Sequence, residues 1–388
     1  MISRSSIAPL TLLCLCLSAL HPFAQGKAKH TLGKLTPADF TLPATPIIDS
    51  NANAVILADL GDVHFVGNTH DWFSYVYVRQ TRIKILNKNA FGLATVNIAL
   101  YDENSENKDN LTNVEATAYT MENGQLQETK LDSKDIYLTR LNKYWTEARF
   151  SVAGVKEGSI LEYTYTITSR NVFDLPAWEF QYEEYPCLSS EYHVEIPQTL
   201  NYVLVRQGVH PYAVDKGSIG HSSYAVTEKA DRIAALGSQD QDLVVHASTV
   251  KHDWVMKNIP SFGTERYLTT PENYLDKISF QQSGTYNGEE SESRTNTWAK
   301  ATEELLSDSR FGGPLNEENY AVNELSDKIA ANGDALARAK AVYYYMSQHF
   351  TCTIYDKYIR TDLRDVIRNN SGTIGDINLL LTALLRRK

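Results

Sequence analysis

The stretch TDLRDVIRNNSGTIGDINLLLTALLRRK, residues 361–388, decides what the C-terminal part of this chain can form. Its beginning predicts a short helix with three apolar residues on one face, Leu363, Val366 and Ile367. Residues 369–372 then indicate a turn. Asp376 is a good N-cap for a second helix over 377–385, and residues 386–388 place positive charge in its last turn, which the helix dipole favours. Because this second helix is apolar on nearly every side, we expect it to be buried in a larger core.

The same stretch carries a spaced motif. The nucleophile region of the transglutaminase-like superfamily has the pattern glycine, any residue, cysteine, any residue, acid. An apolar helix that ends in Leu-Leu-Arg follows this pattern. This sequence resembles that pattern at four places, Gly372, Asp376, Leu380 and the run 384–386. The residue at the position of the cysteine is Ile374. The resemblance implies an α+β, papain-like core with a degenerate nucleophile position.

Ile374 decides the chemistry expected of such a core. A cysteine at a helix N-terminus has a lowered pKa, and a histidine then serves it as base and acid, whereas isoleucine offers no nucleophile. In the superfamily, the catalytic His and Asp lie on strands after this helix, and the present sequence ends at Lys388, before them. We therefore predict a truncated core with no catalytic residue, and Cys352 is the alternative nucleophile.

The N-terminus predicts export. Arg4 precedes an apolar run over 7–20, and Ala24 precedes a fitting cleavage site, so residues 1–24 are predicted to be a signal peptide. The rival interpretation is a membrane anchor, but the run is shorter than the ~20 residues that a span needs. No later stretch is long and apolar enough, so we expect no stable membrane span after cleavage and a periplasmic or outer-envelope location.

Composition describes an ordinary globular protein, with 43% hydrophobic and 22% charged residues over 388 positions, enough for two or three domains. The net charge of −10 argues against nucleic acid as a partner, because nonspecific binding needs a basic face. Outside the predicted signal peptide the cysteines are Cys187 and Cys352. They fall in different predicted domains, so we expect two separate thiols.

Strand patterns dominate after an N-terminal arm over 25–50. In residues 73–86 the apolar parity changes after Val78, which predicts a β-bulge or bend. The dipeptide Asn123-Gly124 lies between two strand patterns and predicts a hairpin. Short strands at regular spacing with little helix predict a mainly β sandwich, immunoglobulin-like or similar, over 51–283.

Residues 228–261 are predicted as a mixed connector within the first domain, and 253–280 as a linking β segment. The polar, acidic residues 284–294 are predicted to link it to a helix-rich region over 295–388, the truncated transglutaminase-like domain. There Asp334 is expected to cap a helix. Three sets of apolar residues share helical faces: Trp298, Ala301, Leu305 and Leu306; Val322, Leu325 and Ile329; Val342, Tyr345, Met346 and His349.

The strand region also resembles a known domain. Five pieces carry the resemblance: QTRIKILNKNAFG (80–92), AYTMENGQL, VKEGSILEYTY, WEFQ and PCLSSEYHVEIP. They are similar to a domain of unknown function that precedes transglutaminase-like cores in exported bacterial proteins, and they cover most of 50–270. The resemblance implies an architecture and a compartment, but no activity.

Other candidate sites have structural alternatives. No histidine has metal-ligand spacing, so we predict no metal and no cofactor; those weighed are His64, His70, His193, His210, His221, His246, His252 and His349. We expect His349 to be a core or interface residue. Four aromatic residues could line a ligand groove, although packing is the more common role of such residues on strands: Tyr75, Tyr77, Trp178 and Tyr182. Three acids are better explained as helix caps or first-turn charges than as acid and base: Asp362, Asp365 and Asp376.

These observations favour a noncatalytic exported protein of the bacterial cell envelope that binds or scaffolds a peptide, protein or glycan. Two alternatives stay open. One is a cysteine acyltransferase or peptidase of the transglutaminase-like class. The other is an N-terminal fragment whose function lies in a missing C-terminal part.

Overall fold

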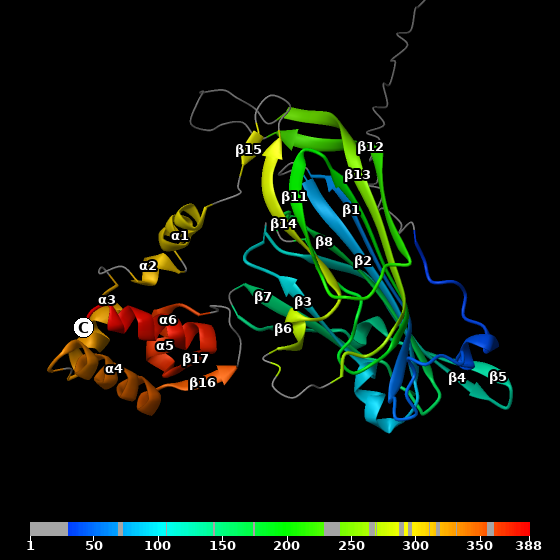
Figure 1. Cartoon of the computed structure of the whole chain (residues 1–388), viewed down its shortest axis with the longest axis horizontal. Coiled ribbons are helices and arrows are strands. Elements are labelled where there is room, and N and C mark those ends of the chain that lie inside the picture. Colours follow the sequence, from blue (N-terminus) through cyan, green and yellow to red (C-terminus); the bar gives the residue numbers. More distant parts are fainter. Residues whose placement is uncertain are drawn as a thin grey trace, which may run out of the picture.

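A computed structural model describes residues 30–388 apart from 69–72, 106, 143, 174, 229–240, 264–267, 269, 287–290, 294–296, 310, 316–318, 331 and 355–360. The predicted signal peptide and His70 lie outside the described residues. Figure 1 shows a strand-rich body and a separate group of helices that ends at the C-terminus. The strand-rich prediction for the N-terminal part and the helical prediction for the C-terminal part are therefore confirmed.

The body is built on a mixed sheet of eight strands. Its order is β12 (Val214–Glu228), β13 (Gln241–Ile259), β10 (Cys187–Pro197), β1 (Ala54–Gly67), β2 (Phe73–Ile85), β8 (Ile160–Ser169), β4 (Asn110–Glu122) and β5 (Gln125–Lys130). Strands β1 and β10 pair in parallel, while the other neighbours are antiparallel. The strand-rich class holds, but this order does not establish the immunoglobulin-like detail.

Two smaller sheets complete the body. One has the order β11 (Leu200–Gln207), β14 (Lys277–Tyr286) and β15 (Ser291–Ser293), with β9 (Trp178–Glu179) also paired to β14. The other has the order β3 (Thr95–Tyr101), β7 (Trp145–Ser151) and β6 (Tyr137–Arg140). The described part of the body also contains four short 3-10 helices, η1 (Pro37–Phe40) ahead of β1 and, between strands, η2 (Lys88–Ala94), η3 (Ser133–Asp135) and η4 (Pro271–Asn273). Apolar side chains from all three sheets share one core cluster.

Local turn chemistry predicted one hairpin of the body well. Asn123 and Gly124 both have positive φ, 52° and 76°, and join β4 to β5 as the Asn-Gly dipeptide predicts. The bulge or bend expected within 73–86 is wrong for β2 itself. The register between β1 and β2 shifts between Ile56 and Ala58, so the extra residue, Leu57, belongs to β1. The residues of β2 in the core cluster keep a single parity from Phe73 to Ile85, because Val76 and Val78 lie on the other, also buried, face.

Two segments differ from the prediction. The expected connector over 228–261 instead contains β13, a strand of 19 residues that pairs with both β10 and β12. Its first half is largely exposed on both faces, so it shows little of the apolar alternation that marks a strand in sequence. The expected linker over 284–294 contains the end of β14 and all of β15, which pair with each other.

The helical part comprises α1 (Trp298–Ser307), α2 (Gly312–Leu315), α3 (Tyr320–Lys328), α4 (Ala335–His349), α5 (Leu363–Asn369) and α6 (Ile374–Leu385), with a parallel pair of short strands, β16 (Thr351–Ile354) and β17 (Ser371–Thr373). Asp334 caps α4 as predicted, because its side chain accepts a hydrogen bond from the Ala337 N–H at 2.8 Å. A second apolar cluster joins α3, α4, α5 and α6, and Leu380 and Leu384 in it are fully buried. Burial of the apolar helix α6 is therefore confirmed.

The predicted face of α1 is not buried. Trp298 is 91% exposed and Leu305 is 53% exposed, and no residue of this helix is buried. His349 is likewise exposed at the end of α4, so its expected place in the core is wrong, whereas a place in an interface stays a prediction. No helix among the described residues combines the length and the apolar character needed to cross a lipid bilayer.

Candidate functional site

The first turn of α6 begins earlier than predicted. Thr373, not Asp376, is the N-cap, and its hydroxyl accepts a hydrogen bond from the Asp376 N–H at 3.2 Å. Asp376 is the third helical residue, and its carboxylate accepts from the Thr373 N–H at 3.0 Å. This reciprocal capping box moves the helix start by three residues and makes Ile374 the first helical residue. The positive charge of residues 386–388 correspondingly lies past the helix end at Leu385.

Ile374 therefore occupies the position at which a thiolate would gain most from the helix dipole. Its side chain is half-buried and offers only hydrocarbon. The predicted motif residues do come together here. A Cβ atom on Gly372 would lie 2.9 Å from the Asp376 Cβ, so this glycine allows the strand to pass directly over the capping carboxylate.

Cys352 lies beside this turn. It is exposed on β16 and is the register partner of Gly372 on β17, two residues before Ile374. Thr353, the next residue of β16, donates its hydroxyl to the Gly372 carbonyl at 3.1 Å. The sequence placed Cys352 on a strand or loop before α5, and that placement is confirmed.

His349 is the sole histidine of the sequence after residue 297. Its ring stacks on Tyr345 with centroids 4.2 Å apart, and Nδ1 donates to the Tyr345 carbonyl at 2.9 Å. One ring nitrogen is therefore committed to its own helix. Of the other candidate acids, Asp362 is the N-cap of α5 and Asp365 lies in its first turn, as predicted.

Cys187 is a core residue. Its side chain is fully buried, and its Sγ donates to the Ser189 carbonyl at 3.4 Å. Burial raises the pKa of this thiol well above its ordinary value, so it carries no thiolate at neutral pH. Neither Cys187 nor Cys352 forms a disulfide, as expected.

The four aromatic residues that could have lined a groove belong to the core, as the more common role of such residues predicts. Tyr75, Tyr77 and Trp178 are buried. The hydroxyl of Tyr182 donates to Asp59, a fully buried carboxylate that also pairs with Arg79. Packing, the structural alternative, therefore explains these four residues.

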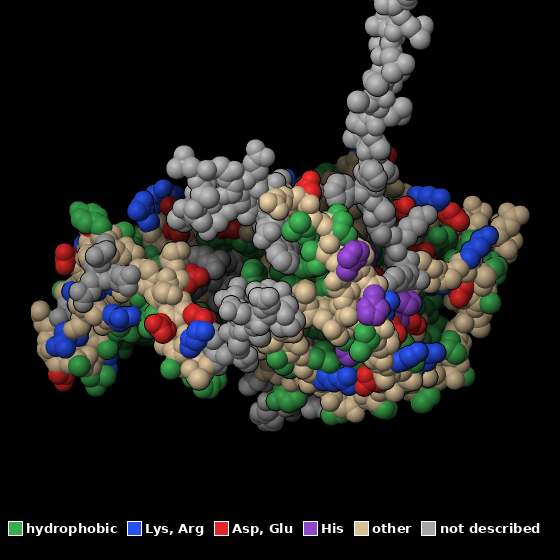
Figure 2. All heavy atoms as spheres, turned by 90° about the horizontal axis from the view of Figure 1, so that it is seen from above, with side chains coloured by type: hydrophobic (Ala, Val, Ile, Leu, Met, Phe, Trp, Pro, Cys, Tyr) green, Lys and Arg blue, Asp and Glu red, His purple; other side chains and the backbone are tan. Residues whose placement is uncertain are grey.

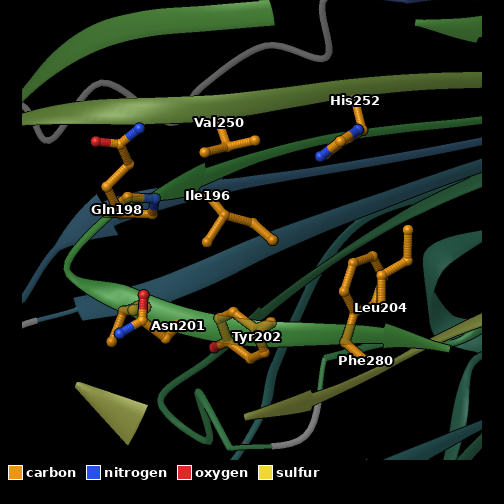
Figure 3. A pocket seen from close by; sticks show the side chains of 10 residues that line it. Ile196, Gln198, Asn201, Tyr202, Leu204, Val250, His252 and Phe280 are labelled. Carbon is orange, nitrogen blue, oxygen red and sulfur yellow. The ribbon is translucent and has the colours of Figure 1, made fainter. Parts of the chain in front are cut away.

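A cavity of about 410 Å³ lies between the large sheet and the β11–β14 sheet. Figure 3 shows its lining, in which Ile196 and Val250 face Leu204 and Phe280 across the space. The polar members of the lining are Gln198, Asn201, Tyr202 and His252. An apolar cavity with a few polar groups at its edge is the usual form of a ligand pocket.

His252 is the imidazole that lines this cavity. Its ring stacks on Trp254 with centroids 4.9 Å apart and an interplanar angle of 4°. Burial, and then the positive charge of Arg206, lower the pKa of His252 below its ordinary value. The imidazole is therefore neutral at pH 7 and can both donate and accept a hydrogen bond.

Strand β11 forms one wall of the cavity and lies at the end of its sheet, so its outer edge has no strand partner among the described residues. Tyr202 and Leu204 point to the cavity side, whereas Val203 and Val205 are 43% and 46% exposed. The sequence showed the strand at 202–205, but nothing in it showed that β10 and β13 would meet β11 around a cavity. A second cavity, of about 740 Å³, lies between α2, α3 and α5 and has a more polar lining.

The comparisons with known proteins agree with this architecture. Residues 73–230 match the family model "Domain of Unknown Function with solved-structure structure (DUF3857)". The expected domain of unknown function is thereby confirmed for these residues. No curated protein sequence matches the chain.

One similar solved structure is a "putative protease" from Parabacteroides distasonis, with a TM-score of 0.55 and 14% identity over 86% of this chain. This chain spans 58% of that protein's length. At such identity the likeness concerns the fold alone. Another is a "putative nutrient binding protein" from Legionella pneumophila, with 9% identity over 87% of this chain and 95% of the other. Its TM-score is 0.23, and we base nothing on it.

Proposed function

We propose that this chain is an exported, noncatalytic binding protein of the bacterial cell envelope. Its strand-rich body binds an extended peptide segment at the cavity beside β11, and its helical part is a degenerate transglutaminase-like domain. The noncatalytic part of this proposal is supported by Ile374. The first helical residue of α6 is where the helix dipole would activate the thiol of the motif, and this residue has no heteroatom in its side chain.

The peptide-binding part of this proposal is supported by the cavity and by strand β11, which forms one of its walls. An edge strand presents unpaired backbone N–H and C=O groups, and an extended peptide can pair with them while alternate side chains enter a pocket. β11 supplies such an edge, and the apolar lining near Leu204 supplies such a pocket. Among the envelope ligands expected from the sequence, a peptide uses both features, whereas a glycan would leave the strand edge unpaired.

A second candidate, a cysteine acyltransferase or peptidase, is favoured by one observation. Cys352 is exposed and is the register partner of Gly372, close to the first turn of α6. The protein with the similar fold is described as a "putative protease". This candidate would require Cys352 to react as a thiolate at neutral pH.

An iodoacetamide rate profile from pH 5 to 9 separates the two candidates. A noncatalytic chain gives a Cys352 alkylation rate that is not yet maximal at pH 6, and it cleaves no peptide in a mixed casein digest. A rate that is already maximal at pH 6, together with casein cleavage lost in Cys352→Ala, would establish the enzyme instead.

Peptide binding is tested with a displayed library of random ten-residue peptides selected on the immobilised chain. Leu204→Arg places a charge in the cavity and should reduce the affinity of selected peptides at least tenfold. Val209→Arg is the matched control, because Val209 is 89% exposed and away from the lining. Equal loss in both variants, or selection of peptides that bind Leu204→Arg unchanged, would refute the site.

A further inference from the structure

The N-terminal arm lies on one row of β2 side chains. Gln80 donates its Nε2 to the His30 carbonyl at 2.8 Å, and its Oε1 accepts from the Leu32 N–H at 3.2 Å. Two residues further along β2, Arg82 donates to the Gly33 carbonyl at 2.5 Å. After another two residues, the ammonium of Lys84 lies 4.5 Å from the Phe40 ring centroid. Residues two apart on a strand share a face, so the arm follows one face of the large sheet.

The start of this arm meets a cluster of ionisable side chains. Asp62 on β1 is the register partner of His193 on β10, and His193 is the register partner of Asp253 on β13. These three residues therefore form a row across adjacent strands on the face that carries the arm. His30 stacks on His193 with ring centroids 3.5 Å apart and an interplanar angle of 12°. Figure 2 shows histidine side chains gathered with acidic ones on one face of the strand-rich body.

Three histidines around this row each have one ring nitrogen beside a carboxylate. His30 Nδ1 lies 3.1 Å from Asp62 Oδ2, and His193 Nδ1 lies 2.7 Å from Asp253 Oδ1. His64, two residues after Asp62, places its Nδ1 3.2 Å from the other Asp62 oxygen. A carboxylate that accepts from one imidazole nitrogen fixes the tautomer and leaves the other nitrogen as a lone-pair donor, as in metal sites.

The second nitrogen of His193 has no hydrogen-bond partner among the described residues. His193 is only 7% exposed, so this Nε2 is a buried polar atom that water does not reach freely. Glu191 Oε2 lies 3.5 Å from it, which is an ion-pair distance but too long for a good hydrogen bond. A cation placed between these two atoms would be bound by both.

We propose that His30 and His193 bind a divalent transition-metal ion, Zn²⁺ in the first instance, while Asp253 orients the His193 ring, and that this ion fastens the N-terminal arm to the large sheet. One polar atom from each of these three residues lies within 4.8 Å of the others. Tetrahedral Zn²⁺ with bonds of about 2.0–2.1 Å needs ligand atoms about 3.4 Å apart. Glu191 Oε2, 3.5 Å from His193 Nε2, already has this spacing and is the third ligand.

The donor set favours zinc over calcium or magnesium. Two imidazoles and a carboxylate suit Zn²⁺, whereas the harder cations prefer oxygen ligands alone. The carboxylates of Asp62, Glu191 and Asp253 also give the cluster negative charge that attracts a cation. Binding requires the His30 ring to leave its stacked position, and this is possible because His30 belongs to the arm and its side chain is 39% exposed.

Attachment of the arm to the sheet by an ion can be measured by the rate of trypsin cleavage within the arm. Lys34 is exposed between the His30 contact and the buried Leu35. Trypsin must lift this segment off the sheet before it can cleave after Lys34. An ion that holds His30 should therefore slow this cleavage, whereas an ion elsewhere on the chain should not.

The test uses the purified chain without an affinity tag, stripped with EDTA and titrated with ZnCl₂ in a calorimeter. We expect one Zn²⁺ per chain, a loss of affinity of at least tenfold in His30→Gln and in His193→Gln, and slower trypsin cleavage after Lys34 only when zinc is present. His246→Gln is the matched control, because this exposed histidine is also on β13 and contacts Ser223 instead of the cluster.

His30→Gln keeps the inference testable if His193→Gln fails to fold, because His30 lies outside the sheets. Three results would overturn it: no zinc binding by the intact chain, equal zinc affinity in the intact chain and His30→Gln, or zinc binding that leaves cleavage after Lys34 unchanged. Protection of the arm by CaCl₂ as strong as that by ZnCl₂ would also overturn the assignment of the donor set.

Discussion

Thr373 and Asp376 hold each other at the start of α6: the Thr373 hydroxyl accepts from the Asp376 N–H, and the Asp376 carboxylate accepts from the Thr373 N–H. The second Asp376 oxygen accepts from the Thr361 N–H at 3.1 Å, which ties α6 to the segment before α5. Asp376 is fully buried. A residue that a catalytic motif would mark as part of a reaction thus has a complete structural role as a helix cap.

Replacing Asp376 should loosen this turn. Asp376→Ala leaves the buried Thr373 N–H and the part-buried Thr361 N–H without their acceptor, which costs about 1–3 kcal/mol. Hydrogen exchange at Thr361 and Thr373 should therefore speed up while exchange in β1 and β2 stays unchanged. Asp365→Ala is the control, because that carboxylate is exposed and pairs with Arg368 on the surface of α5. Unchanged protection at Thr373 would contradict the capping role.

Asp59 should be the most sensitive charged position of the strand-rich body. Its buried carboxylate lies 2.8 Å from Arg79 Nη2 and accepts from the Thr81 hydroxyl at 2.7 Å. Asp59→Ala leaves the Arg79 charge uncompensated, and we expect the free energy of unfolding to fall by about 3–5 kcal/mol in urea titrations.

A surface pair provides the comparison. Lys130 and Glu128 lie 3.6 Å apart and both are exposed, so Glu128→Ala should change stability by less than about 1 kcal/mol. If the two variants have similar urea midpoints, the buried pair contributes far less than its geometry indicates.

Gly61 should tolerate no side chain. A Cβ atom there would lie 2.5 Å from the Trp178 ring and 2.8 Å from the Tyr192 ring, and both rings are buried. Gly61→Ala must displace them, at a cost of about 1–3 kcal/mol that tryptophan fluorescence can follow during unfolding. Gly92→Ala meets nothing within 4 Å and should leave the midpoint nearly unchanged. Equal stability of the two variants would mean that Trp178 repacks freely.

The two thiols should differ in reactivity. Burial keeps the pKa of Cys187 raised in the folded chain, so at pH 8 iodoacetamide should modify Cys352 and spare Cys187, as read by peptide mass spectrometry. In 6 M guanidinium chloride both should react, because unfolding removes the burial. Rapid labelling of native Cys187 would show that the core opens around β10.

Local signals in the sequence predicted local structure. Asp334 caps its helix, Asn123-Gly124 makes its hairpin, and the apolar residues of α6 are buried, since each depends on neighbours within a few positions. Errors arose where two local options compete. Asp376 and Thr373 are both good N-caps, and the capping box uses both residues but starts the helix at Thr373. The exposed α1 face shows that amphipathic spacing does not by itself guarantee burial.

The sequence by itself determined the strand-rich and helical halves, the hairpin, the buried last helix and the hydrocarbon at Ile374, because periodicity, turn residues and side-chain chemistry are properties of short segments. The tertiary structure alone decided the cavity beside β11 and the cluster of His30, His193 and Asp253. The members of that cluster are separated by 163 and 60 positions along the chain, and no motif has such spacing. The pairing of β10 with β13 makes His193 and Asp253 neighbours, because strand register sets which distant side chains lie together, and the contacts of the arm with Gln80 bring His30 onto them.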